Sequence, residues 1–209
     1  MTVYEHVMVG INGTIAAGLH RRHGWQIVAL AGFASVLPDW DALTILLGAN
    51  CFAAGHRLWG HNLLVAGLVA AIVSALAYQV DAPTKIQLGL ARRWAVFSIC
   101  GPMADPARGS RELGLWMLVG VLAAYSHLLM DILCSANKDL PVWGVPLFWP
   151  FSSRMWAYPL LPWGNPGATI IFAAGMFAMV RWRKWIRPIA LAGMVAVAAY
   201  MAACGLLGA

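Results

Sequence analysis

The chain has 209 residues and a mass of 22.5 kDa, enough for one domain or two small ones. Hydrophobic residues make up 61% of it and charged residues only 11%, whereas soluble domains carry about 25% charged residues. This composition excludes a disordered chain, an ordinary cytosolic domain and, despite the net charge of +6, a nucleic-acid-binding domain. The basic residues lie in short connections between apolar runs, which is typical of integral membrane proteins.

Six apolar segments are candidates for membrane-spanning helices. We therefore predict an all-α integral membrane protein, a single membrane domain over residues 1–209 that forms a bundle of about six transmembrane helices. Pro38 lies in the second segment and is expected to kink or break it. The long polar connection at 81–112 is expected to hold one amphipathic helix on the cytoplasmic surface. The six segments are 7–19, 25–47, 62–80, 113–133, 166–180 and 188–207.

Lysine and arginine are distributed unevenly between the loops. The first, third and fifth connections hold 11 of the 14 basic residues, and the opposite side keeps only Arg57, Lys138 and Arg154. The positive-inside rule then predicts that the odd-numbered loops are cytoplasmic and that both termini are extracytoplasmic. His20 and His23 lie in the first basic connection and are expected to be solvated.

A set of ionisable residues falls at the predicted extracytoplasmic end of the spans. Such residues are costly inside a membrane, so their presence there points to a function. They come from four separate segments, share one depth and are all of types that bind metals. The set is His6, Asp39, Asp41, His56, His61, His127 and Asp131.

The spacing of these residues limits how they can meet. His127 and Asp131 are four apart and lie on one helical face. That spacing suits two metal ligands, or a ligand and its orienting carboxylate, or a hydrogen-bonded pair that joins helices. Asp39 and Asp41 would point about 200° apart on a regular helix, so both face one site only if Pro38 distorts the helix. The alternative is that one of them caps a new helix.

The connection between the second and third segments holds two histidines. His56 and His61 are five apart and cannot share a helical face, so we expect one on a turn that ends at Gly60 and the other at a helix start. Arg57 is the only basic residue within the cluster. It is either a bidentate partner for a phosphate oxygen or an ordinary interface anchor.

The order of these motifs resembles the YdjM-type, LexA-regulated family of bacterial inner-membrane proteins, described as predicted membrane-bound metal-dependent hydrolases. The specific parts are Ser-His-x-x-x-Asp at 126–131 and Gly-Val-Pro-Leu-Phe-Trp-Pro-Phe-Ser at 144–152. The resemblance covers 6–152, and the two apolar spans at 165–209 add only hydrophobicity. Where the family usually has Thr and Ser around the second loop histidine, this chain has Gly60 and Asn62. The family is in turn distantly similar to zinc-dependent phospholipase C, which implies phosphoester hydrolysis.

The favoured hypothesis is a membrane-bound metal-dependent hydrolase of the inner membrane, with its site at the extracytoplasmic interface and a phospholipid or lipid-linked phosphoester as substrate. The mixture of His and Asp suits zinc, with manganese as the alternative. Asp39 and Asp41 would be ligands or the general base, and Arg57 would contact the phosphate. The expected metal ligands are His6, Asp39, Asp41, His56, His61, His127 and Asp131.

The alternative is a non-enzymatic membrane protein, such as a metal-ion or proton-coupled transporter. A transporter would place polar residues along a path through the bilayer. Here the ionisable residues gather at one end of the spans, which favours a site over a pathway.

Overall fold

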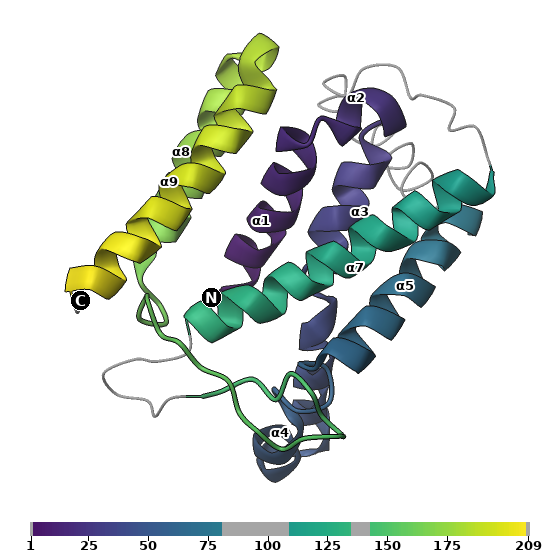
Figure 1. Ribbon diagram of the computed structural model, residues 1–209, viewed down its shortest axis with the longest axis vertical. Helices are drawn as coiled ribbons and strands as arrows, with labels where there is room; N and C mark the ends of the chain where they lie inside the picture. The colour runs from purple at the N-terminus through teal and green to yellow at the C-terminus, as the bar shows by residue number, and fades with distance from the viewer. Residues whose placement is uncertain (1, 81–108, 135–142, 208–209) are drawn as a thin grey trace.

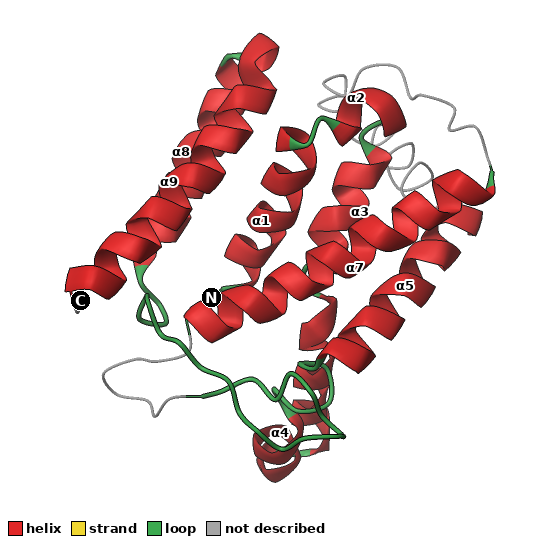
Figure 2. Cartoon of the chain, in the orientation of Figure 1, coloured by secondary structure: helices red, strands yellow, loops and turns green. Residues whose placement is uncertain are grey.

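The computed structural model describes residues 2–80, 109–134 and 143–207, and these are mostly helical (Figure 1). The amphipathic helix predicted in the long polar connection falls largely at 81–108, outside the described residues. The described residues form no strand, and an isolated antiparallel bridge joins Val145 to Trp156. Loops gather mainly at one end, around α4 (Figure 2). The all-helical fold predicted from the sequence is confirmed for this part of the chain.

Each of the six predicted apolar segments is helical. The fourth begins at Ser110, somewhat before its predicted start at 113. Short helices lie in the first, second and fifth connections between them. The elements are α1 (Val3–Ala16), α2 (Leu19–His23), α3 (Gln26–Ala34), the 3-10 helix η1 (Leu37–Leu47), α4 (Ala49–Gly55), α5 (Leu63–Val80), α7 (Ser110–Leu133), α8 (Pro166–Arg181), the 3-10 helix η3 (Arg183–Trp185) and α9 (Ile186–Leu207).

Fewer than six of these helices are long enough to cross a bilayer alone. α5, α7 and the continuous η3–α9 have mean hydropathies of 2.2, 1.8 and 2.1 and sufficient length. α3 and η1 together make a fourth candidate, bent by 47° at the break expected next to Pro38. α1 and α8 have 14 and 16 residues, short of the roughly 20 that a span needs. The described residues thus give three or four candidate spans, where the sequence predicted about six.

α5 and α7 lie side by side because small residues allow their backbones to approach (Figure 1). A Cβ atom on Gly120 would come within 1.9 Å of the Ser74 hydroxyl, and one on Gly67 within 2.6 Å of the Tyr125 hydroxyl. The outer face of α5 is apolar and exposed, as a lipid-facing surface must be. Every fourth residue contributes to that face: Leu64, Leu68, Ile72, Leu76 and Val80.

α8 and α9 form an antiparallel hairpin that packs against α1 (Figure 1). Phe172 and Met201 from the hairpin share a buried cluster with Met8 of α1. At the turn of the hairpin, Arg187 Nε donates a hydrogen bond of 2.9 Å to the Ala16 carbonyl at the end of α1. The first helix is therefore fixed between the hairpin and the α3–α7 layer.

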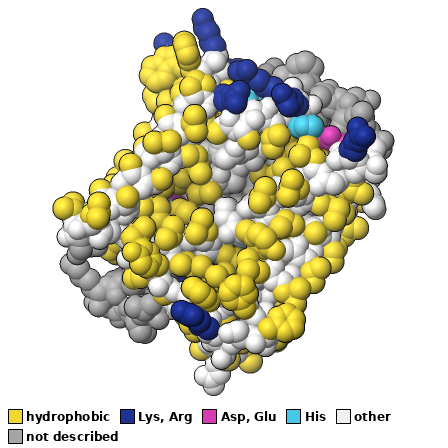
Figure 3. All heavy atoms as spheres, in the orientation of Figure 1, with side chains coloured by type: hydrophobic (Ala, Val, Ile, Leu, Met, Phe, Trp, Pro, Cys, Tyr) yellow, Lys and Arg dark blue, Asp and Glu magenta, His cyan; other side chains and the backbone are white. Residues whose placement is uncertain are grey.

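Lysine and arginine side chains gather at one end of the molecule, around the α8–α9 turn and α2 (Figure 3). Apolar side chains cover most of the surface between the two ends in this view. Lys85, Arg92, Arg93, Arg108 and Lys138 of the predicted charge pattern lie outside the described residues. The described part of that pattern places Arg21, Arg22, Arg111, Arg181, Arg183, Lys184 and Arg187 in the α2, α7-start and α8–α9 connections.

His23, which we expected to be solvated, instead has a specific partner. Its Nδ1 lies 2.9 Å from Glu112 Oε1, and Glu112 also accepts a hydrogen bond of 3.2 Å from Trp116 Nε1. The pair joins α2 to the start of α7 and is partly buried. The sequence pattern missed it because the two residues are 89 positions apart.

Candidate metal centre

The seven predicted ligand residues meet where α1 begins, α7 ends, and the connection between η1 and α5 turns back. This region lies away from α2 and the α8–α9 turn (Figure 1). The side chains of Asp39 and His56 are partly exposed. The other five, His6, Asp41, His61, His127 and Asp131, are buried.

At the middle of this cluster, three ligand atoms form a nearly equilateral triangle. His61 Nε2 lies 3.3 Å from His127 Nε2, and Asp39 Oδ1 lies 3.4 and 3.5 Å from these two nitrogens. Asp131 Oδ2 forms a second triangle on the same pair of nitrogens, also at 3.4 and 3.5 Å. Zinc with bonds of about 2.0–2.1 Å in tetrahedral geometry separates its ligand atoms by about 3.3–3.4 Å. Each triangle therefore fits one face of a zinc coordination sphere.

Both histidines direct Nε2 into the cluster because a hydrogen bond holds the opposite ring nitrogen. His127 Nδ1 lies 2.8 Å from the Ser35 carbonyl, to which its N–H donates. His61 Nδ1 lies 3.0 Å from Asp41 Oδ2. A carbonyl or carboxylate at this position fixes the orientation and tautomer of a metal-binding histidine. The arrangement is thus that of imidazoles prepared to bind a cation.

Asp41 lies beside the central triangle and bonds several groups at once. Its carboxylate accepts from His56 Nδ1 at 2.8 Å, from His61 Nδ1, and from the Gly60 amide at 2.9 Å. Through these hydrogen bonds Asp41 holds the rings of both histidines in position. Asp41, His56 and His61 also form a group whose ligand atoms are close enough to hold an ion themselves.

The 3-10 helix η1 explains how two aspartates only two residues apart both reach the cluster. Pro38 lies in its first turn, after the bend that ends α3. The tighter winding of a 3-10 helix turns successive side chains further than an α-helix does. Asp39 therefore meets the Nε2 side of the His61 ring and Asp41 meets its Nδ1 side. The sequence predicted that Asp39 and Asp41 can face one site only if the helix is distorted near Pro38. The 3-10 helix η1 is that distortion.

His6 stacks on His127, with ring centroids 3.7 Å apart and planes at 20°. Its Nε2 lies 3.3 Å from Asp131 Oδ1. The three residues form another group of ligand atoms close enough for a cation. The other ring nitrogen, Nδ1, is buried and has no hydrogen-bond partner among the described residues. A buried donor or acceptor without a partner is costly, and a bound ligand would remove that cost.

Gly60 and Asn62, where this chain departs from the pattern of the family that it resembles, each have a structural role. A Cβ atom on Gly60 would lie 2.0 Å from the Pro38 carbonyl oxygen, so the loop can approach η1 only with glycine there. Asn62 Oδ1 accepts the Val65 amide at 2.8 Å at the start of α5. Its Nδ2 donates to the Leu58 carbonyl at 3.1 Å. Both residues therefore hold the loop that carries His61.

Arg57 is part of the cluster, as its position in the sequence predicted. Its backbone has a φ of 62°, which turns the chain sharply between His56 and His61. Nη2 lies 3.3 Å from Asp131 Oδ2, and Nη1 donates to the Trp143 carbonyl at 2.8 Å. The guanidinium also lies over the Trp143 ring, 5.1 Å from its centroid. These contacts anchor Arg57 and balance carboxylate charge, so any phosphate contact would add to roles it already has.

His61 lies among three carboxylates, and this sets its protonation. Burial of the ring disfavours its charged form, but hydrogen bonds to Asp131, Asp39 and Asp41 outweigh the burial and raise its pKa to about 10. Without a metal, the protonated ring supplies the positive charge that these carboxylates need. A divalent cation at the same place would supply it instead.

Two partners of the cluster were not identified from the sequence. The Ser35 carbonyl that orients His127 is a backbone group, and residue type carries no signal for it. Trp143, which holds Arg57 and meets the His56 ring edge-on at 5.3 Å, directly precedes the motif at 144–152. That position next to the motif was the one available signal.

Comparison with known proteins identifies a matching family. The model of the YdjM inner membrane protein family matches residues 1–208, which extends the resemblance from 6–152 to the last two helices. No curated protein and no solved structure matches the chain. The distant similarity to zinc-dependent phospholipase C therefore stays a prediction. The match over nearly the whole chain, together with its apolar helices, shows that this protein belongs to the YdjM inner membrane protein family.

Proposed function

We propose that the protein is a metal-dependent hydrolase that cleaves a phosphoester of a phospholipid or lipid-linked molecule at the extracytoplasmic surface of the inner membrane. The observation that carries the proposal is the pair of triangles of ligand atoms built on His61 and His127. Buried imidazoles with fixed orientation, set beside Asp39 and Asp131, are the ligand set that hydrolytic zinc sites use.

The residues divide into three tasks under this proposal. His61, His127, Asp39 and Asp131 would hold a divalent ion, with zinc expected first, and such an ion supplies Lewis acidity and an acidic water at neutral pH. Asp41 positions His61 and His56 through its three hydrogen bonds. Solvent would reach the cluster at its two partly exposed members, Asp39 and His56, and His56, which is outside this ligand set, would accept a proton from the attacking water.

The distribution of charge supports a site rather than a transport pathway. Between residues 7 and 16 of α1, throughout α3 and α5, and between residues 113 and 126 of α7, the sequence contains no Asp, Glu, Lys, Arg or His. A proton-coupled or charge-pairing path through these helices would need ionisable groups there. The ionisable cluster instead ends abruptly against apolar helix surfaces.

A groove next to the cluster supports a lipid substrate. It has a volume of about 250 Å³ and is lined by α1 and α7, with Met194 of α9 at its side. It starts one helical turn from His6 at Gly10 and next to His127 at Ser126. It then follows both helices away from the cluster as far as Val119 in α7 and Leu19, just beyond the end of α1. An acyl chain lying there would place its headgroup near the ends of α1 and α7 that carry His6 and His127.

Metal content tests the proposal first. Purified wild-type protein should contain a stoichiometric divalent metal by elemental analysis, and His127→Ala and Asp131→Ala should lose most of it. The matched control is His20→Ala, which removes a histidine whose ring packs at a tilt of 39° against Trp25, away from the predicted ligands. Wild-type protein purified without a chelator and free of metal would count against the hydrolase. If His127→Ala and Asp131→Ala lowered the thermal stability without lowering the metal content, the cluster would be a structural contact between helices.

Hydrolysis tests the chemistry and the substrate class. Zinc-loaded protein should release headgroups from a panel of phospholipids and lipid-linked phosphates, followed by mass spectrometry, and Asp39→Asn should abolish release while the protein stays folded. The metal-loaded protein could instead be inactive on every phosphoester and active on a carboxylic ester or amide. That result would support a hydrolase but contradict the proposed substrate class.

Filling the groove tests the place of the lipid tail. A Cβ atom on Gly13 would meet nothing within 4 Å, so Gly13→Leu fits the fold and fills the groove. We expect a raised KM for a long-chain substrate and an unchanged KM for its short-chain analogue. Gly175→Leu, at an equally open position on α8, is the control. An equal effect on both substrates would contradict the tail site.

A further inference from the structure

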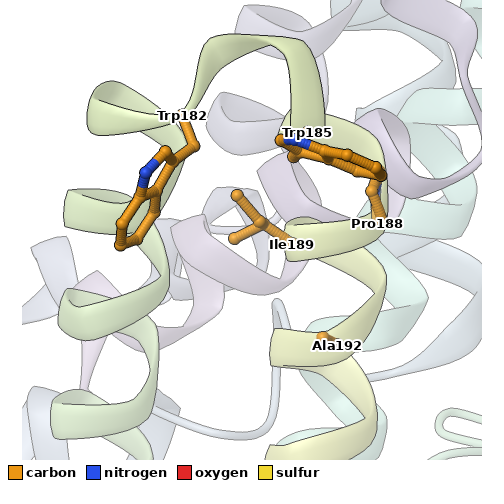
Figure 4. Close-up of a pocket in the computed structure, with 5 residues that line it drawn as sticks. All are labelled: Trp182, Trp185, Pro188, Ile189 and Ala192. Atoms are coloured by element: carbon orange, nitrogen blue, oxygen red, sulfur yellow. The ribbon is translucent and has the colours of Figure 1, made fainter.

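A second concave surface lies in the α8–α9 hairpin, far along the chain from the metal cluster (Figure 4). The cavity has a volume of about 440 Å³, and its lining atoms are almost all apolar. The rings of Trp182 and Trp185 stand on either side of Ile189, and Pro188 and Ala192 complete the wall (Figure 4). Both tryptophans are more than half exposed, at 52% and 61%. This groove is open to the surroundings and has no described segment seated in it.

Positive charge surrounds the mouth of this groove. Arg181, Arg183 and Lys184 lie in the turn next to the two tryptophans, and all three are exposed. No Asp or Glu follows Asp139 anywhere in the sequence, so no acidic residue of the hairpin offsets them. Arg187 is different, because its guanidinium is bonded to the Ala16 carbonyl. The turn thus carries three cations without an ion-pair partner among the described residues.

The groove and the charges together define the ligand. From Trp185 to Ala192 the groove follows about 10 Å of α9, from the charged turn towards the apolar middle of the hairpin. A ligand that matches both parts has an anionic head and an apolar tail in line with the helix. A soluble anion has no apolar part to fill the groove. A zwitterionic lipid has no net negative charge to pair with the three basic residues.

We propose that the α8–α9 hairpin binds one anionic phospholipid, with its phosphate at Arg181, Arg183 and Lys184 and an acyl chain in the groove between Trp182 and Trp185. This lipid belongs to the leaflet at the basic end of the molecule. The site is separate from the metal cluster and does not depend on the proposed hydrolase activity.

Native mass spectrometry of the full chain in detergent tests the headgroup part. Phosphatidylglycerol should bind more tightly than phosphatidylcholine with the same acyl chains. Arg183→Gln combined with Lys184→Gln should weaken phosphatidylglycerol binding about tenfold or more, since each basic residue near a membrane surface contributes to attraction of anionic lipid. The control, Arg21→Gln with Arg22→Gln, removes the same charge from α2 and should change binding much less. Equal binding of the two lipids, or an equal loss in the control, overturns the proposal.

Filling the groove tests the acyl-chain part. Ala192→Trp places a ring in the groove and should reduce phosphatidylglycerol binding to the level of phosphatidylcholine. Ala196→Trp, one turn further along the same exposed face and outside the groove, should leave it unchanged. Undiminished binding in Ala192→Trp overturns the proposal. So does displacement of the lipid by glycerol 3-phosphate at comparable concentration, because the turn would then bind the anion without the tail.

Discussion

Asp41 connects two histidines and a backbone amide through one carboxylate. Such a residue controls a metal site without lying at its centre, because it fixes the ring orientation of the ligands. His56 and His61 both donate a hydrogen bond to it, and the Gly60 amide donates the third. Replacing Asp41 therefore tests orientation, whereas replacing Asp39 tests a candidate ligand.

Asp41→Asn should weaken metal binding by about 10–100-fold without abolishing it, the usual effect of losing a partner behind a ligand. Competition with a chelator of known affinity would measure the change. Glu112→Gln is the matched control, because it neutralises a carboxylate that also pairs with a histidine, at the other end of α7. Wild-type affinity in Asp41→Asn would mean that its hydrogen bonds do not orient the ligands.

Metal binding should depend on pH through His61. Its pKa of about 10 lies above the ordinary value of 6.5, so the ring is protonated at neutral pH when no metal is bound. A metal binds only the neutral ring, so zinc binding at pH 7 should release about one proton, and affinity should increase as the pH rises towards 10. Calorimetry in buffers of different ionisation enthalpy measures the proton count. Binding without proton release would contradict the protonated ring.

The sequence identified the members of the cluster but not their arrangement. His127 and Asp131 were predictable because helical spacing alone puts them on one face. The task of Asp41 was not, because it depends on the 3-10 winding of η1 and on the positive φ of Arg57. Those are properties of a loop packed against a helix, and residue spacing does not encode them.

The connection between η1 and α5 is the element that brings these parts together. It can lie against η1 only because Gly60 has no side chain. The Pro38 carbonyl is a backbone atom in a packed helix, so it cannot move aside as a flexible side chain could. The close packing of this loop against η1 therefore requires a residue without a side chain at position 60.

Gly60→Ala should destabilise the protein by about 1–3 kcal/mol, the usual cost of overpacking, and should lower metal content because the loop carries His61. Thermal unfolding and elemental analysis measure the two effects. Gly114→Ala, in an open position of α7, should be neutral or slightly stabilising. Equal behaviour of the two variants would show that the loop has room to adjust.

Hydropathy predicted where the helices lie, because apolar side chains must face lipid or core. It also predicted about six spans, a number that the three or four candidate spans of the described residues do not confirm. α1 and α8 are apolar but short, and α3 with η1 is bent by 47°. Whether such segments span depends on how they pack against long neighbours such as α7.

At the scale of the whole molecule, the basic residues predict the orientation. The turn at Arg183 and the α2 region should be cytoplasmic, and the metal cluster should face the opposite side. Alkaline phosphatase fused after Ala209 should therefore be active, and the same enzyme fused at Arg183 should be inactive. The reverse result would place the cluster in the cytoplasm and reject an extracytoplasmic substrate.

The stacking of His6 on His127 has a consequence for how the protein is made. His6 lies at the start of α1 and is synthesised well before its stacking partner, which belongs to α7 and follows only after α5. The complete set of ligands therefore does not exist during the insertion of the first helices. In the proposed metal site, a cation would be bound with full affinity only after α7 has left the ribosome and docked against α1. Metal loading then reports the completion of assembly, and a chain interrupted before α7 would enter the membrane without it.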